Sequence, residues 1–304
     1  MEGNCGFTRR LLGLLEKHSN TVPVLLSSSI QAEIDNPYGL SKRAAEELVL
    51  DYSRKSGVPV YIYRLANLFG KWSRPNYNTV VATYCHNIAR GLDIQINNPD
   101  AELHLCYVDD VVEEFLRALD AAPTRKGGYC AVSVSYRIKL GELAEKIRGF
   151  SGCRGNLSVP DMSDSFTRKL YATYLSFLPE DGFSYPLNMK VDDRGSFTEF
   201  LRTPERGQVS VNVAKPGITK GNHWHHTKNE KFLVVKGEAV IRFRKVGSRE
   251  VFEYRVSGEN LEVVDIPVGY THSITNTGDT DLVTVMWASE PFDPDKPDTY
   301  FMEV

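Results

Sequence analysis

Three histidines and a glutamate lie close together in the stretch HWHHTKNEKFLVVKG, residues 223–237. Side chains two residues apart on a β-strand point to the same face, so His223 and His225 project together and His226 projects oppositely. Imidazole nitrogens and carboxylate oxygens are both ligands of divalent metal ions. A further histidine follows a proline-glycine turn in PVGYTHSITN, residues 267–276. We therefore expect one metal site, formed by His223, His225, Glu230 and His272.

Three nitrogens and one oxygen leave coordination positions open on most divalent metals, which is the condition for metal-assisted catalysis. The same ligands accept zinc, manganese, iron or nickel, and they also suit an ion that only braces the fold. Four side chains near the ligands in sequence are able to exchange a proton with a substrate, and the spacing does not choose between them: Lys220, His226, Lys228 and Tyr270.

A second group of reactive side chains lies in DNPYGLSK, residues 35–42. Tyr38 and Lys42 are one helical turn apart, so they share one face of a helix. The positive charge of the lysine favours the ionised phenol, which can then exchange a proton with a carbonyl or a hydroxyl near neutral pH. The serine run at residues 27–29 ends the preceding strand pattern and adds hydroxyl groups.

The elements that carry this second group alternate between helix and strand. Apolar runs at residues 22–29 and 58–65 are typical of buried parallel strands, and a strong helix pattern covers residues 38–56. We expect a parallel sheet with helices on its faces. We also expect Asp109 and Asp110 of CYVDDVV to cap a helix. Further helix patterns cover residues 7–18, 77–90, 109–120 and 139–149.

The histidine cluster lies in a different structural context. After Pro160 the sequence shows one helix pattern, near residues 164–177, and then many short strands broken by glycine and asparagine turns. That texture, which runs from Tyr185 to Trp287, is typical of an antiparallel sandwich or barrel. The boundary falls at residues 178–184. We therefore expect two domains, 1–178 and 179–304.

The bulk composition excludes several classes of protein. A chain of 304 residues with a formal net charge of −3 is long enough for two domains and has no massed basic residues for nucleic acid. Its five cysteines are an odd number without CxxC spacing, which favours a reducing compartment. No segment approaches the roughly 18 apolar residues of a membrane helix. We expect a cytoplasmic protein without a nucleic-acid or membrane partner.

The C-terminal half resembles the cupin family, which folds as an all-β jelly roll and holds a metal ion with residues from two motifs. Both motifs are present at the usual spacing, about forty residues apart. One position departs from the pattern, because Leu261 stands where the second motif usually opens with glycine, although Gly258 is nearby. The matching residues are Gly217, His223, His225, Glu230 and Gly237 in the first motif and Pro267, Gly269, His272 and Asn276 in the second.

The N-terminal half resembles the extended short-chain dehydrogenases, which reduce or epimerise nucleotide sugars with NAD(P). The resemblance implies a catalytic triad of Ser29, Tyr38 and Lys42, with Ser28 as the alternative hydroxyl, and it implies that Tyr38 and Lys42 also contact the cofactor. Asn67, in the stretch YRLANLFG, stands where that family meets its substrate.

The start of the sequence departs from the dehydrogenase pattern. A dinucleotide-binding fold opens with a strand, a glycine-rich turn and a helix whose N-terminus faces the pyrophosphate. Here the pair Gly3-x-x-Gly6 has no strand before it. We therefore expect a truncated α/β Rossmann-like domain, in which binding of NADPH is in question, followed by the cupin domain.

Over essentially its whole length, and most closely in LLSSSIQA, VDDRGSFTEF and PDTYF, the sequence resembles the CapF-type family of bifunctional capsular polysaccharide biosynthesis enzymes. The resemblance implies a homodimer that acts on a UDP-sugar, with zinc in the cupin domain and NADPH in the reductase domain. The cupin domain would epimerise C3 of a UDP-4-keto-6-deoxy-N-acetylhexosamine, and the reductase domain would then reduce the C4 ketone.

Three hypotheses follow from these expectations. Both activities are present; or the chain is a metal-dependent epimerase with an inactive reductase; or the N-terminal part is only a scaffold for dimerisation or substrate binding. Binding of NADPH, followed by its fluorescence, separates the first hypothesis from the others. Exchange of the C3 proton of the keto-sugar with solvent separates the second from the third.

Overall fold

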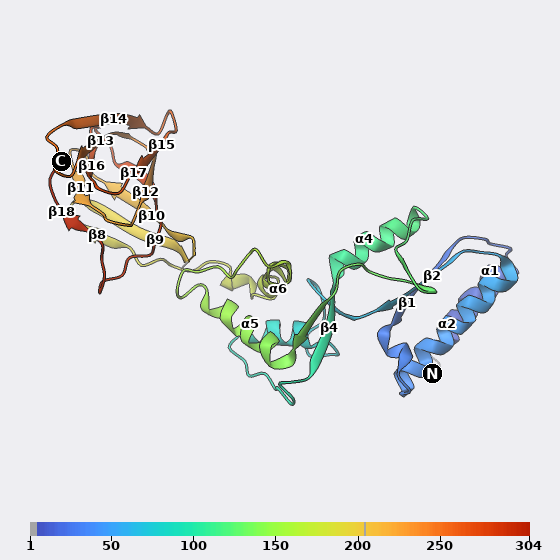
Figure 1. Ribbon diagram of the computed structural model, residues 1–304. Helices are drawn as coiled ribbons and strands as arrows, with labels where there is room; N and C mark the ends of the chain where they lie inside the picture. The colour runs from blue at the N-terminus through green and yellow to red at the C-terminus, as the bar shows by residue number, and fades with distance from the viewer. Residues whose placement is uncertain (1–4, 204) are drawn as a thin grey trace. The chain divides into compact units, whose positions relative to one another are not determined.

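The computed structural model describes residues 5–203 and 205–304, which separate into two compact units (Figure 1). The N-terminal unit contains residues up to 151 and residues 161–180, and the C-terminal unit contains residues 152–160 and 181–304. Of the expected Gly3-x-x-Gly6 pair, Gly3 lies outside the described residues. Within those residues, no helix combines the length and the apolar character that crossing a membrane requires.

Helix α2 (Pro37–Ser56) carries Tyr38 in its first turn and begins as the sequence predicts. The N-cap residue Asn36 accepts a hydrogen bond from the backbone N–H of Gly39 at 2.8 Å. Pro37 suits the first helical position because that position needs no intrahelical donor. The helix ends at Gly57, whose φ of 73° favours glycine. The expected helix at 38–56 is confirmed.

Helix α2 connects two parallel strands, β1 (Val24–Ser29) and β2 (Val60–Leu65). The expectation of one parallel sheet is wrong in part, because the described strands of the N-terminal unit form two mixed sheets, in the orders β1-β2-β6-β5 and β3-β4-β7. The pairs β5–β6 and β4–β7 are antiparallel. The two-residue turn Gly127-Gly128 joins β5 to β6, and so short a connection permits only antiparallel pairing. The other elements of this part are α1 (Phe7–Lys17), η2 (Ile30–Glu33), β3 (Asn67–Phe69), α3 (Val80–Ile88), β4 (Glu102–Tyr107), α4 (Val108–Leu119), β5 (Arg125–Lys126), β6 (Tyr129–Cys130), β7 (Tyr136–Lys139), α5 (Leu140–Gly152) and α6 (Ser165–Leu175).

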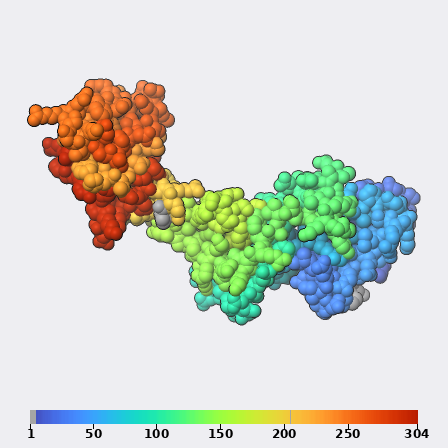
Figure 2. Space-filling model, viewed as in Figure 1, coloured from blue at the N-terminus to red at the C-terminus, as the bar shows by residue number. Residues whose placement is uncertain are grey.

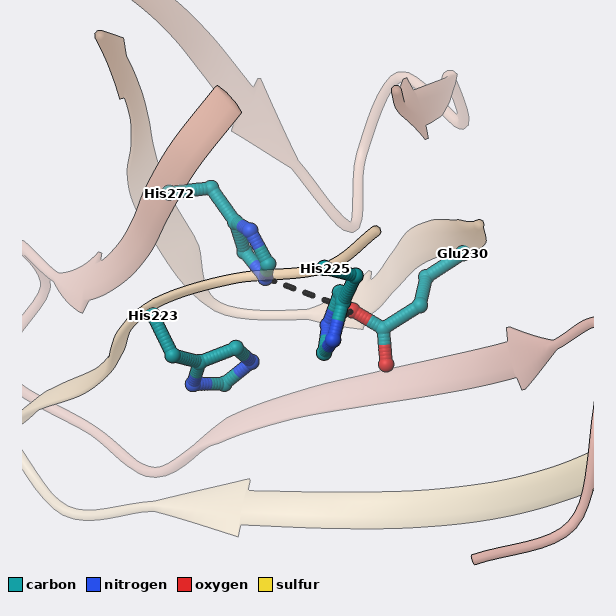
Figure 3. A group of neighbouring side chains, drawn as sticks. All are labelled: His223, His225, Glu230 and His272. Atoms are coloured by element: carbon teal, nitrogen blue, oxygen red, sulfur yellow. Dashed lines mark hydrogen bonds and ion pairs between the residues drawn. The ribbon is translucent and has the colours of Figure 1, made fainter. Parts of the chain in front are cut away.

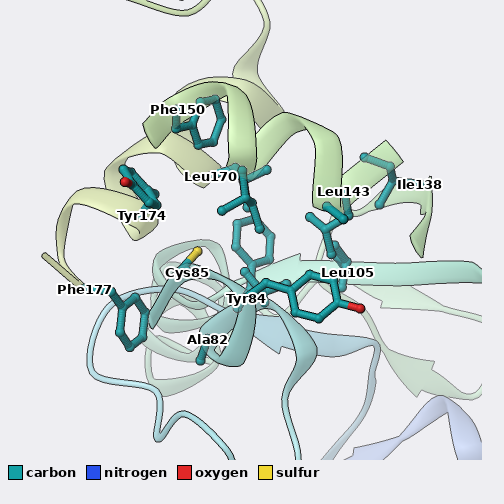
Figure 4. Close-up of a cluster of buried hydrophobic side chains, with 14 of the residues drawn as sticks. Ala82, Tyr84, Cys85, Leu105, Ile138, Leu143, Phe150, Leu170, Tyr174 and Phe177 are labelled. Atoms are coloured by element: carbon teal, nitrogen blue, oxygen red, sulfur yellow. The ribbon is translucent and has the colours of Figure 1, made fainter. Parts of the chain in front are cut away.

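A large apolar cluster of the N-terminal unit includes side chains from α3, α5, α6 and β4 (Figure 4). Leu143 of α5, Leu170 of α6 and Cys85 of α3 are completely buried, and Leu105 of β4 is 1% exposed. Burial of such side chains stabilises the fold by about 1.5–3 kcal/mol each. Helix α6 is therefore part of this core, although residues 153–164 separate it from α5 in sequence.

The acidic pair at the start of α4 does not cap the helix. The N-cap residue is Tyr107, which makes no side-chain cap. Asp109 instead pairs with Lys71 Nζ at 2.8 Å, and Asp110 pairs with Lys169 Nζ at 2.7 Å. The capping prediction is wrong because lysines from other segments reach these carboxylates and form charge-assisted hydrogen bonds. Both acids still lie in the first helical turn, where the helix dipole favours negative charge.

The C-terminal unit is all-β, as expected for a cupin. Its described strands form two antiparallel sheets, in the orders β15-β12-β17-β10-β9-β8 and β14-β13-β16-β11-β18. Side chains from both sheets form its apolar core, and Ile241, Ile266 and Leu282 are at most 1% exposed. The elements from residue 180 on are η3 (Glu180–Gly182), β8 (Lys190–Asp192), β9 (Gly195–Thr203), β10 (Gly207–Ala214), β11 (Thr219–Trp224), β12 (Glu230–Lys236), β13 (Glu238–Lys245), β14 (Val251–Ser257), β15 (Val263–Ile266), β16 (Tyr270–Asn276), β17 (Leu282–Ala288) and β18 (Tyr300–Phe301).

The close approach of α2 to the preceding η2 turn gives a testable prediction. A Cβ at Gly39 would overlap the carbonyl oxygens of Gln31 and Ile34, so Gly39→Ala should lower the free energy of unfolding by about 1–3 kcal/mol. Helix propensity alone predicts the opposite sign, because alanine exceeds glycine by about 1 kcal/mol in a helix. The matched control is Gly13→Ala in α1, where no atom lies within 4 Å of the added methyl. Urea unfolding followed by circular dichroism should show Gly39→Ala destabilised and Gly13→Ala slightly stabilised; a stabilised Gly39→Ala would contradict the close approach.

Candidate functional site

The residues of the expected metal site come together in the C-terminal unit, and both of its sheets contribute (Figure 3). His223 of β11 and His272 of β16 are direct partners in the antiparallel register of these strands. His225 follows the end of β11, and Glu230 is the first residue of β12 in the other sheet. One ligand atom from each of the four residues lies within 4.8 Å of the others.

An irregularity in β11 precedes His223. The register with β16 shifts between Gly221 and His223, where Gly221 has a φ of 99° and Asn222 a φ of 57°. A bulge of this kind redirects the following side chain. A Cβ at Gly221 would lie only 2.8 Å from the carbonyl oxygen of His272, so the approach of β11 to β16 requires glycine.

The donor set fits a divalent metal ion. The Nε2 atoms of His225 and His272 each lie 3.3 Å from Glu230 Oε2. His272 is completely buried, and neither of its ring nitrogens makes a hydrogen bond within residues 5–203 and 205–304, so the 3.3 Å contact of Nε2 with Glu230 is its one polar approach there. A buried imidazole without hydrogen bonds costs free energy, which coordination to a metal removes. The geometry therefore fits imidazoles that bind a metal through Nε2 better than it fits isolated buried rings.

The protonation states also fit metal binding, which requires neutral imidazoles and an ionised carboxylate. Burial lowers the pKa of His223 to about 4, and the neighbouring His272 adds to the effect. Burial alone would raise the pKa of Glu230, but the close approach of His225 and His272 outweighs it and holds that pKa well below its usual range. These two ligands are therefore in the form that binds a cation near neutral pH.

The metal-site residues border a pocket of about 580 Å³, whose lining includes His223, His225 and Glu230. Of the candidate proton-transfer residues, Lys220 and Lys228 also line this pocket. Phe197 and Phe232 form an apolar part of the pocket wall. A pocket of this size accommodates a sugar ring with its attached groups.

The four candidate proton-transfer residues have different surroundings. Lys220 Nζ donates to Asn212 Oδ1 at 2.8 Å and to the Val213 carbonyl at 2.9 Å, and burial lowers its pKa. Lys228 is 6% exposed. The other two are not among the lining residues. The ring of His226 packs on Trp224 at 4.5 Å and on Tyr300 at 5.0 Å, and Tyr270 packs against the apolar core.

The expected dehydrogenase residues meet at a second pocket, of about 610 Å³, in the N-terminal unit. Its lining includes Ser29, Tyr38, Lys42 and Asn67. Lys42 Nζ donates to the Ser27 carbonyl at 3.1 Å and lies 5.7 Å from the centre of the Tyr38 ring. The shared helix face of Tyr38 and Lys42, and their position beside the serine run, are as the sequence predicts.

The two candidate hydroxyls differ in their partners. Ser28 Oγ donates to Glu46, whose side chain is 2% exposed, and Arg64 donates to the same carboxylate. Ser29 Oγ accepts a hydrogen bond from the backbone N–H of Gln31 at 3.2 Å, so its own proton remains for a ligand. Sequence reasoning missed Glu46, although its position eight residues after Tyr38 places it on the same helix face.

Comparisons with known proteins match both units. Residues 4–130 match the NAD dependent epimerase/dehydratase family, and residues 190–300 match the polysaccharide biosynthesis C-terminal domain. A UDP-2-acetamido-2,6-beta-L-arabino-hexul-4-ose reductase of Pseudomonas aeruginosa strain PA103 is 48% identical over 302 residues, which are 99% of this chain and 81% of that protein.

Solved structures agree with these matches. The capsular polysaccharide assembling protein CapF from Staphylococcus aureus aligns with a TM-score of 0.96 and 56% identity, over 98% of this chain and 82% of that chain. A structure of CapF with the inhibitor 3-isopropenyl-tropolone aligns with a TM-score of 0.91 and 53% identity, over 98% of this chain and 83% of that chain. The chain therefore belongs to the CapF-type family of bifunctional capsular polysaccharide biosynthesis enzymes, with a short-chain dehydrogenase fold followed by a cupin fold.

Proposed function

We propose that this protein makes a UDP-sugar precursor of capsular polysaccharide in two steps. The cupin domain, residues 179–304, epimerises C3 of a UDP-4-keto-6-deoxy-N-acetylhexosamine, and the reductase domain, residues 1–178, reduces the C4 ketone with NADPH. The observation that carries the proposal is the convergence of three imidazoles and one carboxylate, of which His223, His225 and Glu230 line a pocket. The name of the Pseudomonas relative, a hexul-4-ose reductase, supports a substrate with a ketone at C4.

The epimerisation needs an acidified proton beside the ketone. A divalent ion, which we propose to be zinc, would supply that acidity by polarising the carbonyl oxygen. His223, His225, Glu230 and His272 would hold the ion. The inhibitor of the CapF structure supports a metal, because tropolones carry adjacent carbonyl and hydroxyl oxygens that chelate divalent ions.

A side chain of the pocket must carry the C3 proton. Lys220 is the best candidate, because it lines the pocket and burial lowers its pKa, which makes proton transfer near neutral pH easier. The oxygens of Asn212 and Val213 keep its Nζ in place. Lys228 also lines the pocket, and its Nζ donates to Pro297 O and Thr299 Oγ1.

The reduction would take place in the N-terminal pocket. NADPH supplies the hydride when it is bound. The Tyr38 hydroxyl donates the proton to the C4 oxygen, and the charge of Lys42 stabilises the phenolate that remains. Ser29 donates a hydrogen bond to the same oxygen, and Asn67 holds the substrate. We propose that the active form is a homodimer, in agreement with the family resemblance.

The metal ligands provide the first test of this function. The double variant His223→Ala, His225→Ala should lose zinc from the purified protein and abolish exchange of the C3 proton with solvent, because two of the four ligands are gone. The control is His226→Ala, a histidine of the same stretch whose ring packs on Trp224 and Tyr300. It should keep both zinc and exchange. Proton exchange that persists in the zinc-free double variant would reject the metal role.

The proton carrier can be tested in the same assay. Lys220→Met should slow the exchange at C3 by at least roughly 100-fold, which is the usual contribution of a positioned acid or base. Tyr270→Phe should leave the rate unchanged, because Tyr270 packs against the apolar core. Zinc content should be normal in both variants. An unchanged rate in Lys220→Met would exclude Lys220 as the carrier.

The two serines separate catalysis from stability. Ser29→Ala should reduce the rate of ketone reduction about 100-fold, because it removes a donor to the developing oxyanion. Ser28→Ala should instead lower the free energy of unfolding by about 1–3 kcal/mol, because the buried Glu46 loses a donor. Consumption of NADPH and urea unfolding measure the two effects. The reverse pattern would assign the catalytic hydroxyl to Ser28, and absence of NADPH binding would exclude the hypothesis that both activities are present.

A further inference from the structure

A segment near the C-terminus holds the loop that carries His225. The carboxylate of Asp298 accepts hydrogen bonds from three consecutive backbone N–H groups, those of residues 226, 227 and 228, at 2.9–3.0 Å. It also accepts one from Thr227 Oγ1 at 2.9 Å. In the space-filling view the residues closest to the C-terminus, in red, lie on the surface of the C-terminal unit (Figure 2). One side chain thus satisfies the donors of a whole turn.

The main chain of Asp298 contacts the metal ligand itself. Its carbonyl oxygen lies 2.6 Å from His225 Nδ1. A carbonyl oxygen only accepts hydrogen bonds, so Nδ1 must carry the proton. In the neutral ring Nε2 then presents a lone pair, 3.3 Å from Glu230 Oε2. Two acceptors that face each other are stabilised by a cation between them, and the same tautomer is the one that ligates a metal through Nε2.

The conformation of Asp298 is unusual and is fixed from both sides. Its backbone φ is 34°, a value that residues other than glycine rarely adopt. Lys228 Nζ donates to Pro297 O at 3.3 Å and to Thr299 Oγ1 at 3.1 Å, on either side of Asp298. The next residues form β18, which pairs with β11 beside His223. Such a conformation persists only where the surroundings determine it.

From these contacts we propose that Asp298 is a positioning residue of the metal centre. Its carboxylate fixes the turn after β11, and its carbonyl sets the tautomer of His225. The role rests on the proposed metal site, and it adds that the ligand geometry depends on a residue 73 positions after His225 in the chain. Partners of this kind around metal-bound histidines typically change metal affinity 10- to 100-fold.

The first measurement is the affinity for Zn²⁺ alone, by competition with a chromophoric chelator. Asp298→Ala should raise the dissociation constant about 10- to 100-fold. Asp298→Asn should raise it less, because asparagine keeps an acceptor oxygen and tolerates a positive φ. The matched control is Asp295→Ala in the same segment, whose side chain makes no hydrogen bond or ion pair with the described residues. This control should bind Zn²⁺ like the wild type.

The second measurement is the tautomer of His225 in the metal-free protein, from the ring nitrogen resonances. The wild type should carry its proton on Nδ1. Asp298→Ala should show a mixture of tautomers, because without the carboxylate the carbonyl of residue 298 is no longer held against Nδ1. If the alanine variant does not fold, the asparagine variant carries both measurements. Unchanged Zn²⁺ affinity in the folded variants beside normal wild-type binding, or a wild-type proton on Nε2, would overturn the role of Asp298 alone. A wild type that binds no Zn²⁺ would overturn the proposed metal function as well.

Discussion

The antiparallel register between β11 and β16 is the constraint on which the C-terminal site depends. It sets His223 directly opposite His272, so that two imidazoles from distant parts of the sequence lie next to each other. A shift of one residue would turn the strand over and send the ligands to the other face. The register is fixed by the glycine at 221, which lets the backbones approach, and by the apolar side chains between the sheets. Packing therefore positions the ligands. Their lone pairs face one another, and a bound cation would stabilise this arrangement.

The N-terminal site depends on a different interaction, the buried hydrogen bonds and ion pair around Glu46. This carboxylate on α2 accepts from Ser28 of β1 and from Arg64 of β2, and so ties one helix to two strands. Buried charges of this kind require all their partners, because an unpaired carboxylate is costly in a low dielectric. Tyr38 and Lys42 lie on the same helix, and their distance from the serine run follows from this attachment. The site is thus as rigid as the packing of α2 on its sheet.

The sequence predicted the features that depend on local pattern. The helix that begins beside Tyr38 has its cap, its proline and its terminal glycine within the segment itself, and the alternation of HWHH determines which histidines share a face. It did not predict features set by distant partners. The lysines that pair with Asp109 and Asp110 lie 38 and 59 residues away, and no local signal marks them. The same reason explains why Asp298 escaped notice and why the strands of the first unit were assigned to one sheet.

The interleaved order of the two units has a consequence for synthesis on the ribosome. Helix α6 completes the apolar cluster of the first unit, yet it is translated after residues 152–160, which belong to the second. During synthesis, residues 152–160 therefore emerge before their partners in the second unit, while the core of the first unit forms. Residues translated later supply the partners of this segment. The backbone N–H of Arg202, for example, donates a hydrogen bond to the carbonyl of Leu157. A cut near residue 179 would therefore separate the second unit from nine of its own residues.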